Sequence, residues 1–347
     1  MTQMRTHDTS IEVFSTCPPS SGDDAAAYAD HVRRVARWSD RAGCRGILVY
    51  TDNSLLDPWL VSQIIIEATE RLAPLVAVQP IYMHPYTVAK MVTSFGFLYG
   101  RRLYLNMVAG GFTNDLAGMN DATPHDRRYA RLVEYTTIVR RLLEGASPVS
   151  HEGEFYRVTN LRLAPPLSPA LLPGIVVSGS SEAGLAAARE IGAVAIHYPK
   201  PAQEYRGTTL GQAPPAGIRV GIICRERGEE AWAIARARFP EDRKGQLAHQ
   251  LAMKVSDSAW HRQLSAIGTA SEENPYWLVP FQNYKTFCPY LVGSYDVVAG
   301  ELEHYIAAGY RSFILDVPRD DQDLEHTRIA FDRALEAVAC PSDSRTG

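Results

Sequence analysis

The sequence predicts an α/β protein of the (β/α)8 TIM-barrel class with insertions. Eight steps from an apolar, strand-length run to a helical pattern follow one another along the 347 residues. The apolar runs contain few polar residues, which is typical of barrel strands buried on both faces. No Pro-, Ser- or Gly-rich linker divides the chain. We therefore expect one domain over residues 1–347, with residues 240–291 as a lid-like insertion segment within it.

The first half of the chain alternates strands and helices at short intervals. In the first helix Tyr28, Val32 and Val35 recur at helical spacing. Pro124 suits the first turn of the fourth helix, because it lacks the N–H that would remain unpaired there. The predicted elements are the strand Ile11–Phe14, the helix Asp24–Ala42, the strand Ile47–Tyr50, the helix Pro58–Thr69, the strand Leu75–Gln79, the helix Tyr86–Tyr99, a strand beginning near Arg102 and a helix after Pro124.

The second half continues the alternation but contains three irregularities. Val149–Leu163 holds Gly153 among alternating residues, which predicts a hairpin outside the main repeat, after the fourth helix. Glycines and prolines between Pro201 and Gly217 leave room for only a stunted sixth helix. The insert after the seventh helix is too long to be a structureless connection. The regular elements are the strand Ile175–Val177, the helix Ala183–Glu190, the strand Ala193–His197, the strand Arg219–Cys224, the helix Glu229–Phe239, the helix Asp296–Ala308, the strand Ser312–Asp316 and the helix Gln322–Ala339.

Composition narrows the function classes. A formal net charge of -4 gives no basic footprint, so we expect neither nucleic acid nor an anionic membrane as a partner. The apolar runs are too short to span a membrane, and Met1–Ser10 has no apolar core of a signal peptide. The five cysteines are odd in number and contain no Cys-x-x-Cys pair, which favours reduced thiols in the cytoplasm.

A serine-rich segment, Ser178-Gly179-Ser180-Ser181, directly follows a predicted strand and opens a helix. Its backbone N–H groups, its hydroxyls and the positive end of the helix dipole could bind an anion. A serine N-cap with no ligand would explain the same residues. In a barrel, the loops after the late strands commonly hold phosphate.

A second informative stretch runs from Arg102 to Tyr129. A buried apolar run is interrupted by Asn106, whose amide must find hydrogen-bond partners in the protein or in a ligand. The motifs Asn-Met-Val-Ala-Gly-Gly and His-Asp-Arg-Arg-Tyr in this stretch resemble the bacterial luciferase-like flavin monooxygenases, most closely the two-component alkanesulfonate monooxygenases. The resemblance extends from about Val13 to about Phe331 and includes Asp57-Pro58-Trp59-Leu60-Val61 and Glu230-Ala231-Trp232.

The resemblance implies an FMN site. Family positions that contact the flavin correspond to Asn106, suited to the polar edge of the isoalloxazine, and to Tyr129, suited to ribityl or phosphate oxygens. His125 heads the same motif and either touches the flavin or substrate or stabilises its helix. The segment that binds the FMN phosphate in this family corresponds to the four residues of the serine-rich segment, Ser178, Gly179, Ser180 and Ser181.

The residues with which the family handles a sulfonate are mostly replaced. Leu55 stands for a cysteine, Tyr198 for a tryptophan, Gly221 for a histidine and Val317 for a tyrosine, whereas Arg219 is kept. An alkanesulfonate is therefore not the expected substrate. As candidate catalytic residues at strand ends we predict Arg219, which could instead form a buried ion pair, together with His84, Tyr198 and Asp52.

The insert contains unusually many aromatic residues, from Tyr276 to Tyr290. They could pack an ordinary subdomain, or they could close over a flavin and exclude water. The family's lid arginine is absent, and we predict that Asn283, Tyr284 or Lys285 approaches the substrate instead. Only Lys285 carries a cation, and it does so without the fork of an arginine.

As the resemblance implies, we expect a cytoplasmic two-component monooxygenase in which reduced FMN and O2 form a flavin peroxide that oxygenates a small organic substrate. The chain has no Gly-x-Gly-x-x-Gly after a strand, so a separate NAD(P)H:flavin reductase would supply reduced FMN. We expect a homodimer or homotetramer. The alternatives are an F420-dependent oxidoreductase of the same fold and a catalytically idle flavin-binding relative. A metal-dependent hydrolase is not expected, because no His/Asp cluster has ligand spacing.

Overall fold

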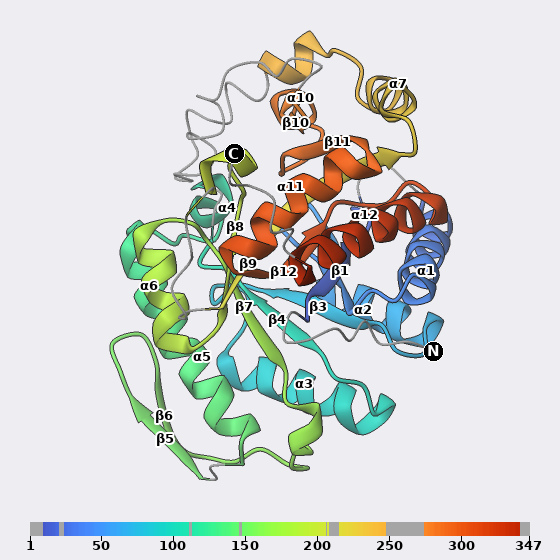
Figure 1. Ribbon diagram of the computed structural model, residues 1–347. Coiled ribbons are helices and arrows are strands. Elements are labelled where there is room, and N and C mark those ends of the chain that lie inside the picture. The colour runs from blue at the N-terminus through green and yellow to red at the C-terminus, as the bar shows by residue number, and fades with distance from the viewer. Residues whose placement is uncertain are drawn as a thin grey trace. The chain divides into compact units, whose positions relative to one another are not determined.

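The computed structural model describes residues 10–20, 24–110, 113–145, 148–205, 207, 215–247 and 274–340. As predicted, the fold is a (β/α)8 barrel of parallel strands with helices between them. The chain divides into two compact units. We call Cys17–Ile196 the early unit, and the residues up to Thr16 together with those from His197 onward the late unit. Figure 1 shows the elements of both. The single-domain organisation stays a prediction.

The early unit contains five parallel strands in the order β2-β3-β4-β7-β8. Its core lies between these strands and the helices that follow them, and its largest buried side chains include Trp59 and Tyr135. In Figure 1 the green helices α5 and α6 lie side by side along this sheet. The elements are α1 (Ala25–Arg41), β2 (Gly46–Val49), α2 (Pro58–Ala68), β3 (Ala73–Val78), α3 (Pro85–Tyr99), β4 (Tyr104–Met107), α4 (Thr113–Gly118), α5 (His125–Leu143), β5 (Val149–Glu152), β6 (Arg157–Leu161), η1 (Pro169–Leu171), β7 (Gly174–Ser178), α6 (Glu182–Ile191) and β8 (Val194–His197).

The predicted hairpin after the fourth barrel helix is confirmed. Strands β5 and β6 pair antiparallel with each other and with no other strand of the described chain. Glu134 of α5 fastens the hairpin, because its carboxylate accepts hydrogen bonds from the backbone N–H groups of Phe155 (3.0 Å) and Tyr156 (2.6 Å). His151 of β5 reaches the same carboxylate at 3.2 Å.

The late unit contains β1 and the strands of the second half, in the order β10-β11-β9-β12-β1. The long strand β9 pairs with β12 through its first half and with β11 through its second half. The elements are β1 (Glu12–Thr16), η2 (Ala202–Tyr205), β9 (Ala216–Arg225), α7 (Gly228–Arg238), β10 (Tyr276–Trp277), α10 (Val279–Gln282), β11 (Tyr290–Ser294), α11 (Tyr295–Ala308), β12 (Tyr310–Leu315) and α12 (Asp321–Ala339).

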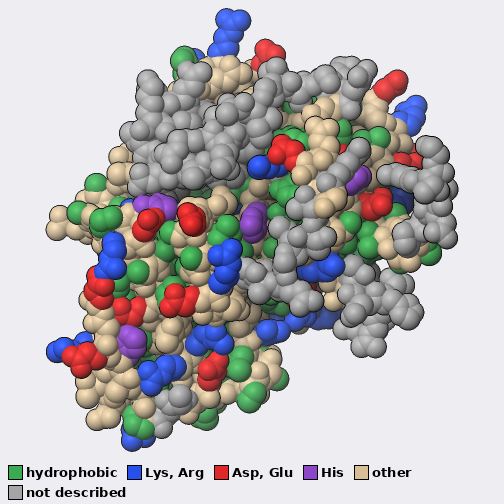
Figure 2. Space-filling view, turned by 60° about the vertical axis from the view of Figure 1, so that its left-hand side comes forward, with side chains coloured by type: hydrophobic (Ala, Val, Ile, Leu, Met, Phe, Trp, Pro, Cys, Tyr) green, Lys and Arg blue, Asp and Glu red, His purple; other side chains and the backbone are tan. Residues whose placement is uncertain are grey.

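Two of the predicted irregularities fall partly outside the described residues. The place of the sixth barrel helix holds the single short 3₁₀ turn η2, but residues 208–214 are not described. Of the insertion segment 240–291, residues 248–273 are likewise not described. On the face that Figure 2 shows, acidic and basic side chains are interspersed. No helix of the described chain is long and apolar enough to cross a membrane.

Candidate functional site

Strands β4 and β7 bring the predicted asparagine and the serine-rich segment together. The two strands pair in parallel, with Asn106 opposite Val176. Asn106 is only 4% exposed, and its Oδ1 accepts a hydrogen bond from the Ser178 hydroxyl at 2.7 Å. The buried amide oxygen thus has the partner that its position requires.

Tyr129 of α5 lies against the same segment. A Cβ added to Gly179 would overlap the Tyr129 hydroxyl oxygen and lie 3.1 Å from the ring carbon that carries it. A Cβ added to Gly184, in the first turn of α6, would lie 2.8 Å from the Gly179 carbonyl oxygen. The loop is therefore pressed between a tyrosine and a helix, and glycine is the residue that fits at both positions.

The serine-rich segment ends as a helix cap. Ser181 is the N-cap of α6, and its hydroxyl accepts a hydrogen bond from the N–H of Gly184 at 3.2 Å. The segment before it, Ser178 to Ser180, lies at the positive end of the helix dipole. The two explanations of the sequence, an N-cap and an anion site, are compatible in this geometry, since the cap uses only one of the three serines.

His125 completes the group at the start of α5. Its ring meets that of Tyr129 edge to face, with 5.2 Å between the ring centroids, and its Nδ1 lies 2.7 Å from the Asp126 carboxylate. The early unit thus brings together every residue that the resemblance assigns to the flavin, namely Asn106, His125, Tyr129, Ser178, Gly179, Ser180 and Ser181. Their contacts with a flavin stay a prediction.

Asp121, which the sequence analysis did not single out, fixes the start of α5. Its carboxylate accepts hydrogen bonds from Arg131 (2.6 Å) and from both the N–H (3.1 Å) and the hydroxyl (2.5 Å) of Thr123. Burial by itself raises the pKa of Asp121, but these donors outweigh it and lower the pKa to about 2. The sequence signal was present, because an aspartate two residues before a threonine and three before a proline is typical of a turn that precedes a helix.

Two of the predicted catalytic residues belong to the early unit. Asp52 follows β2 and holds a turn, since its Oδ1 accepts hydrogen bonds from the Ser54 N–H and hydroxyl at 2.7 and 2.6 Å. His84 is the N-cap of α3, and its Nδ1 accepts a hydrogen bond from the Tyr86 N–H at 3.2 Å. The structural explanation of His84 is thus realised, whereas its catalytic role stays a prediction.

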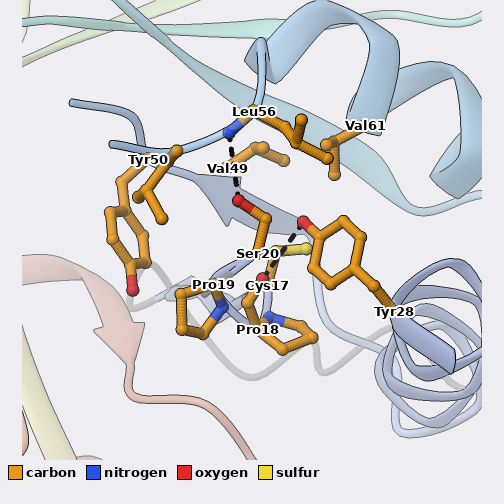
Figure 3. A pocket seen from close by; sticks show the side chains of 10 residues that line it. Cys17, Pro18, Pro19, Ser20, Tyr28, Val49, Tyr50, Leu56 and Val61 are labelled. Atoms are coloured by element: carbon orange, nitrogen blue, oxygen red, sulfur yellow. Dashed lines mark hydrogen bonds between the residues drawn. The ribbon is translucent and has the colours of Figure 1, made fainter. Parts of the chain in front are cut away.

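Figure 3 shows how the loop that carries Asp52 is attached to the segment after β1. The Ser20 hydroxyl accepts a hydrogen bond from the Leu56 N–H at 3.0 Å, and the Tyr28 hydroxyl donates to the Pro18 carbonyl at 3.4 Å. Cys17 and Leu55 also line this pocket, whose volume of about 10 Å³ is that of a single water site. It is too small for a substrate, so it serves to hold the loop.

The other two predicted catalytic residues are in contact within the late unit. Arg219 of β9 is 9% exposed and donates a hydrogen bond to the Tyr198 hydroxyl. Burial raises the pKa of Tyr198, and the Arg219 charge opposes this only in part. Tyr198 therefore keeps its proton at neutral pH, and the pair offers an O–H donor next to a guanidinium.

Tyr290 occupies the space beside Gly221. A Cβ added to Gly221 would overlap the Tyr290 ring, and the Tyr290 hydroxyl donates to Asp316 Oδ2 at 2.7 Å. Burial is the main reason why the pKa of Tyr290 is raised well above 10. The position at which the sulfonate enzymes have a histidine is thus filled by the ring of a residue on the neighbouring strand.

Most aromatic residues of the insertion segment pack in the core of the late unit. Tyr276, Trp277, Phe281 and Tyr290 are each 6% exposed or less. The predicted lid residues differ from one another. Asn283 is fully buried and donates to the Pro240 carbonyl at 2.9 Å, Tyr284 is 39% exposed, and Lys285 pairs with Asp242 at 2.9 Å. Their approach to a substrate stays a prediction.

A parallel barrel with this group of residues at the ends of β4 and β7 defines the class of the protein. The chain belongs to the luciferase-like monooxygenase family, whose model its residues 9–312 match. It is thus an enzyme of the oxidoreductase class. The described residues contain no group of three or more His, Cys, Asp or Glu side chains that could hold a metal ion.

The chain is similar to particular proteins over most of its length and of theirs. The chain is 37% identical over 322 residues to the 4-(γ-L-glutamylamino)butanoyl-[BtrI acyl-carrier protein] monooxygenase BtrO of Niallia circulans, covering 90% of this chain and 93% of BtrO. Among solved structures, DmoA from Hyphomicrobium sulfonivorans has a TM-score of 0.74 and 16% identity, covering 98% of this chain and 90% of DmoA. An F420-dependent secondary alcohol dehydrogenase has a TM-score of 0.63 and 13% identity, covering 94% and 99% of the two chains.

Proposed function

We propose that this enzyme is a two-component monooxygenase that uses reduced FMN and O2 to oxygenate an organic substrate. The observation that carries the proposal is the close approach of Tyr129 to Gly179 beside the N-terminus of α6. A separate NAD(P)H:flavin reductase supplies the reduced flavin, and the enzyme acts as a homodimer or homotetramer in the cytoplasm.

The residues of the early unit fit FMN chemically. The phosphate suits the N–H groups and hydroxyls of Ser178 to Ser181, because a helix N-terminus favours a negative charge. The Tyr129 hydroxyl, directly above Gly179, is a further donor to a phosphate oxygen. Asn106 offers an amide to the polar edge of the isoalloxazine, in exchange for its hydrogen bond with Ser178. Reduced FMN, when bound, supplies the electrons that activate O2.

The substrate is proposed from BtrO, whose name describes an acyl group carried by a protein. At 37% identity over 90% of the chain, an acyl thioester with an internal amide is the best-supported substrate class. The loss of most sulfonate-handling residues agrees with this choice, since it removes the reason to expect a sulfonate.

Within the late unit, Arg219 and Tyr198 have separable proposed roles. The guanidinium of Arg219 stabilises negative charge that develops during oxygen transfer. The Tyr198 hydroxyl holds a proton that burial keeps in place, so it donates a hydrogen bond to an oxygen atom of the substrate. Neither role requires a change of protonation state near neutral pH.

The test is oxygen-dependent turnover with a chemically defined substrate. NADH, a flavin reductase, FMN and the N-acetylcysteamine thioester of 4-(γ-L-glutamylamino)butanoic acid should give a product that gains one atom of ¹⁸O from ¹⁸O2. Octanesulfonate under the same conditions should release no sulfite above background. Turnover without O2 but with reduced F420 would instead establish the F420-dependent oxidoreductase, which the similarity to the F420-dependent dehydrogenase keeps as the second candidate.

A further inference from the structure

The early unit contains a cavity whose lining includes none of the residues assigned to the flavin. It lies at the carboxyl ends of β2 and β3 and has a volume of about 280 Å³. A volume of roughly 10–15 Å³ of this kind is enough for one water molecule, so the cavity can hold a group of several heavy atoms. Its lining residues are Thr51, Asp52, Asn53, Leu55, Asp57, Pro58, Trp59, Ala77, Val78, Gln79, Tyr82 and Met83.

The cavity adjoins the strand that carries Asn106. Ala77 of β3, which lines the cavity, is the register partner of Asn106 on β4. The Val78 carbonyl, one residue further, accepts a hydrogen bond from the Val108 N–H at 2.9 Å. A molecule in this cavity is thus one strand away from the residue assigned to the isoalloxazine, which is a suitable place for one end of a substrate.

The polar lining includes hydrogen-bond acceptors on Gln79 and Asp52. Gln79 is 8% exposed, and among the described residues its Oε1 has no hydrogen-bond partner, while its Nε2 makes only contacts of 3.5 Å with the Thr51 carbonyl and the Tyr82 hydroxyl. Because Gln79 lines the cavity, this oxygen is available to a ligand that donates a hydrogen bond. Asp52 also lines the cavity, and its carboxylate has a second oxygen besides the Oδ1 that accepts the hydrogen bonds from Ser54.

The charges around the cavity are negative. Asp115 accepts a hydrogen bond from the N–H of the lining residue Asn53 at 3.2 Å, and the Tyr82 hydroxyl donates to Asn53 Oδ1 at 2.7 Å. Burial, with Asp115 and Asp52 adding to it, raises the pKa of Tyr82 to about 12. No lining residue of the described chain is a lysine, arginine or histidine. A cation would be attracted here.

We propose that this cavity binds a primary ammonium group of the substrate, with Asp52 as its ion-pair partner and Gln79 Oε1 as a second acceptor. An ammonium group has three donors and no acceptor, which matches this lining. The inference rests on the proposed function, because it assigns one end of the same substrate. It makes Asp52 a specificity-determining residue.

Two thioester probes that differ at one group test the proposal. The first is the N-acetylcysteamine thioester of 4-(γ-L-glutamylamino)butanoic acid, and the second is the corresponding glutarylamino compound, which lacks the amine but keeps the carboxylate. Binding is measured by calorimetry on the protein loaded with oxidised FMN. We expect the amine-bearing probe to bind at least tenfold more tightly than the glutarylamino probe.

The variant Asp52→Asn keeps the size and the acceptor that holds Ser54 but removes the charge. It should reduce the preference to less than threefold and leave FMN affinity unchanged. Asp30→Asn removes an equal charge from an exposed position on α1 and should keep the full preference. Equal binding of both probes to the unmodified protein, binding of neither, or an undiminished preference in Asp52→Asn would overturn the inference. Oxygen incorporation is scored separately, so a protein that prefers the amine but oxygenates nothing contradicts the proposed function and not the cavity assignment.

Discussion

At the scale of single residues, the absence of one Cβ decides how the loop after β7 meets α5. Gly179 has an ordinary backbone conformation, so its importance lies in the space that the Tyr129 hydroxyl takes. The proposed phosphate site depends on this contact, because it brings a hydroxyl donor to the start of α6.

We therefore expect Gly179→Ala to weaken FMN binding at least tenfold and to lower the melting temperature, since the new methyl group pushes Tyr129 away. Adding Tyr129→Phe removes the overlapping oxygen and should restore part of the melting temperature but not the FMN affinity. Gly300→Ala on α11 is the matched control, because its Cβ would meet nothing within 4 Å. Fluorescence titration with FMN and thermal unfolding measure both effects. Normal FMN binding by Gly179→Ala would contradict the proposed site.

Asp121 gives a prediction of pH dependence. Its folded pKa of about 2 lies below the ordinary value of 3.8, so its contribution to stability is complete above pH 4 and is lost as the pH falls towards 2. The shift corresponds to about 2 kcal/mol at neutral pH. Asp121→Asn should lower the unfolding free energy in urea by that amount at pH 7 and by progressively less below pH 4. Asp30→Asn, at an exposed ion pair, should change it little. A difference that is constant from pH 7 to pH 3 would refute this account.

At the scale of secondary-structure elements, Glu134 of α5 fixes the turn of the hairpin β5–β6. Glu134 is bonded to two consecutive backbone N–H groups of the turn, and these bonds are charge-assisted. The hairpin pairs with no other described strand, and its further contacts with α5 include the hydrogen bond from Arg141 to the Ser150 carbonyl and the packing of Tyr156 against Tyr135.

Glu134→Ala should loosen the turn of the hairpin without unfolding the barrel. We expect amide hydrogen exchange at Phe155 and Tyr156 to accelerate at least tenfold, because hydrogen bonds to a charged group contribute about 1.5–3 kcal/mol each. Glu144→Ala removes a carboxylate from the exposed end of the same helix and should leave both amides protected. Unchanged protection in Glu134→Ala would mean that backbone pairing alone fixes the turn.

The regular elements could be predicted from the sequence because burial imposes a local pattern on each of them. The first helix was expected over Asp24–Ala42 and is found over Ala25–Arg41. Two elements gave no such signal. The helix α4 is short and polar and buries only Leu116. The strand β11 begins at the end of the insertion segment, and its partner β9 is distant in the sequence. A pairing that depends on a remote strand leaves no local period to detect.

At the scale of the whole molecule, flavin binding should be visible as stability. A ligand that binds only the folded state at a hundredfold excess over its Kd stabilises that state by about 2.7 kcal/mol. FMN at that concentration should raise the melting temperature by several degrees, whereas riboflavin at the same concentration should raise it much less, since it lacks the phosphate. Equal shifts for both would show that the serine-rich segment does not bind the phosphate.

Only those residues of the candidate site that belong to a recognisable sequence motif could be predicted. Asn106 and Ser178 stood out by their places in the sequence, the resemblance assigned them and Tyr129 to the flavin, and the structure brings the three together from separate elements. The cavity near Gln79 could not be predicted, because its shape depends on the loop after β2 and on the end of β3 at once. From the sequence alone, a glutamine at the end of an apolar run does not show whether its side chain lines a cavity.

The contact between Gly221 and Tyr290 also constrains the evolutionary history of the site. In the sulfonate enzymes that the chain resembles, a histidine takes the place of Gly221, but here any side chain at that position would overlap a ring that Asp316 holds by its hydroxyl. A single step from glycine to histidine would therefore disrupt the core before it could provide any chemistry. A viable path must first reduce Tyr290 to a smaller side chain and only then enlarge Gly221. The order of these two substitutions is fixed by packing, whichever substrate selection favours.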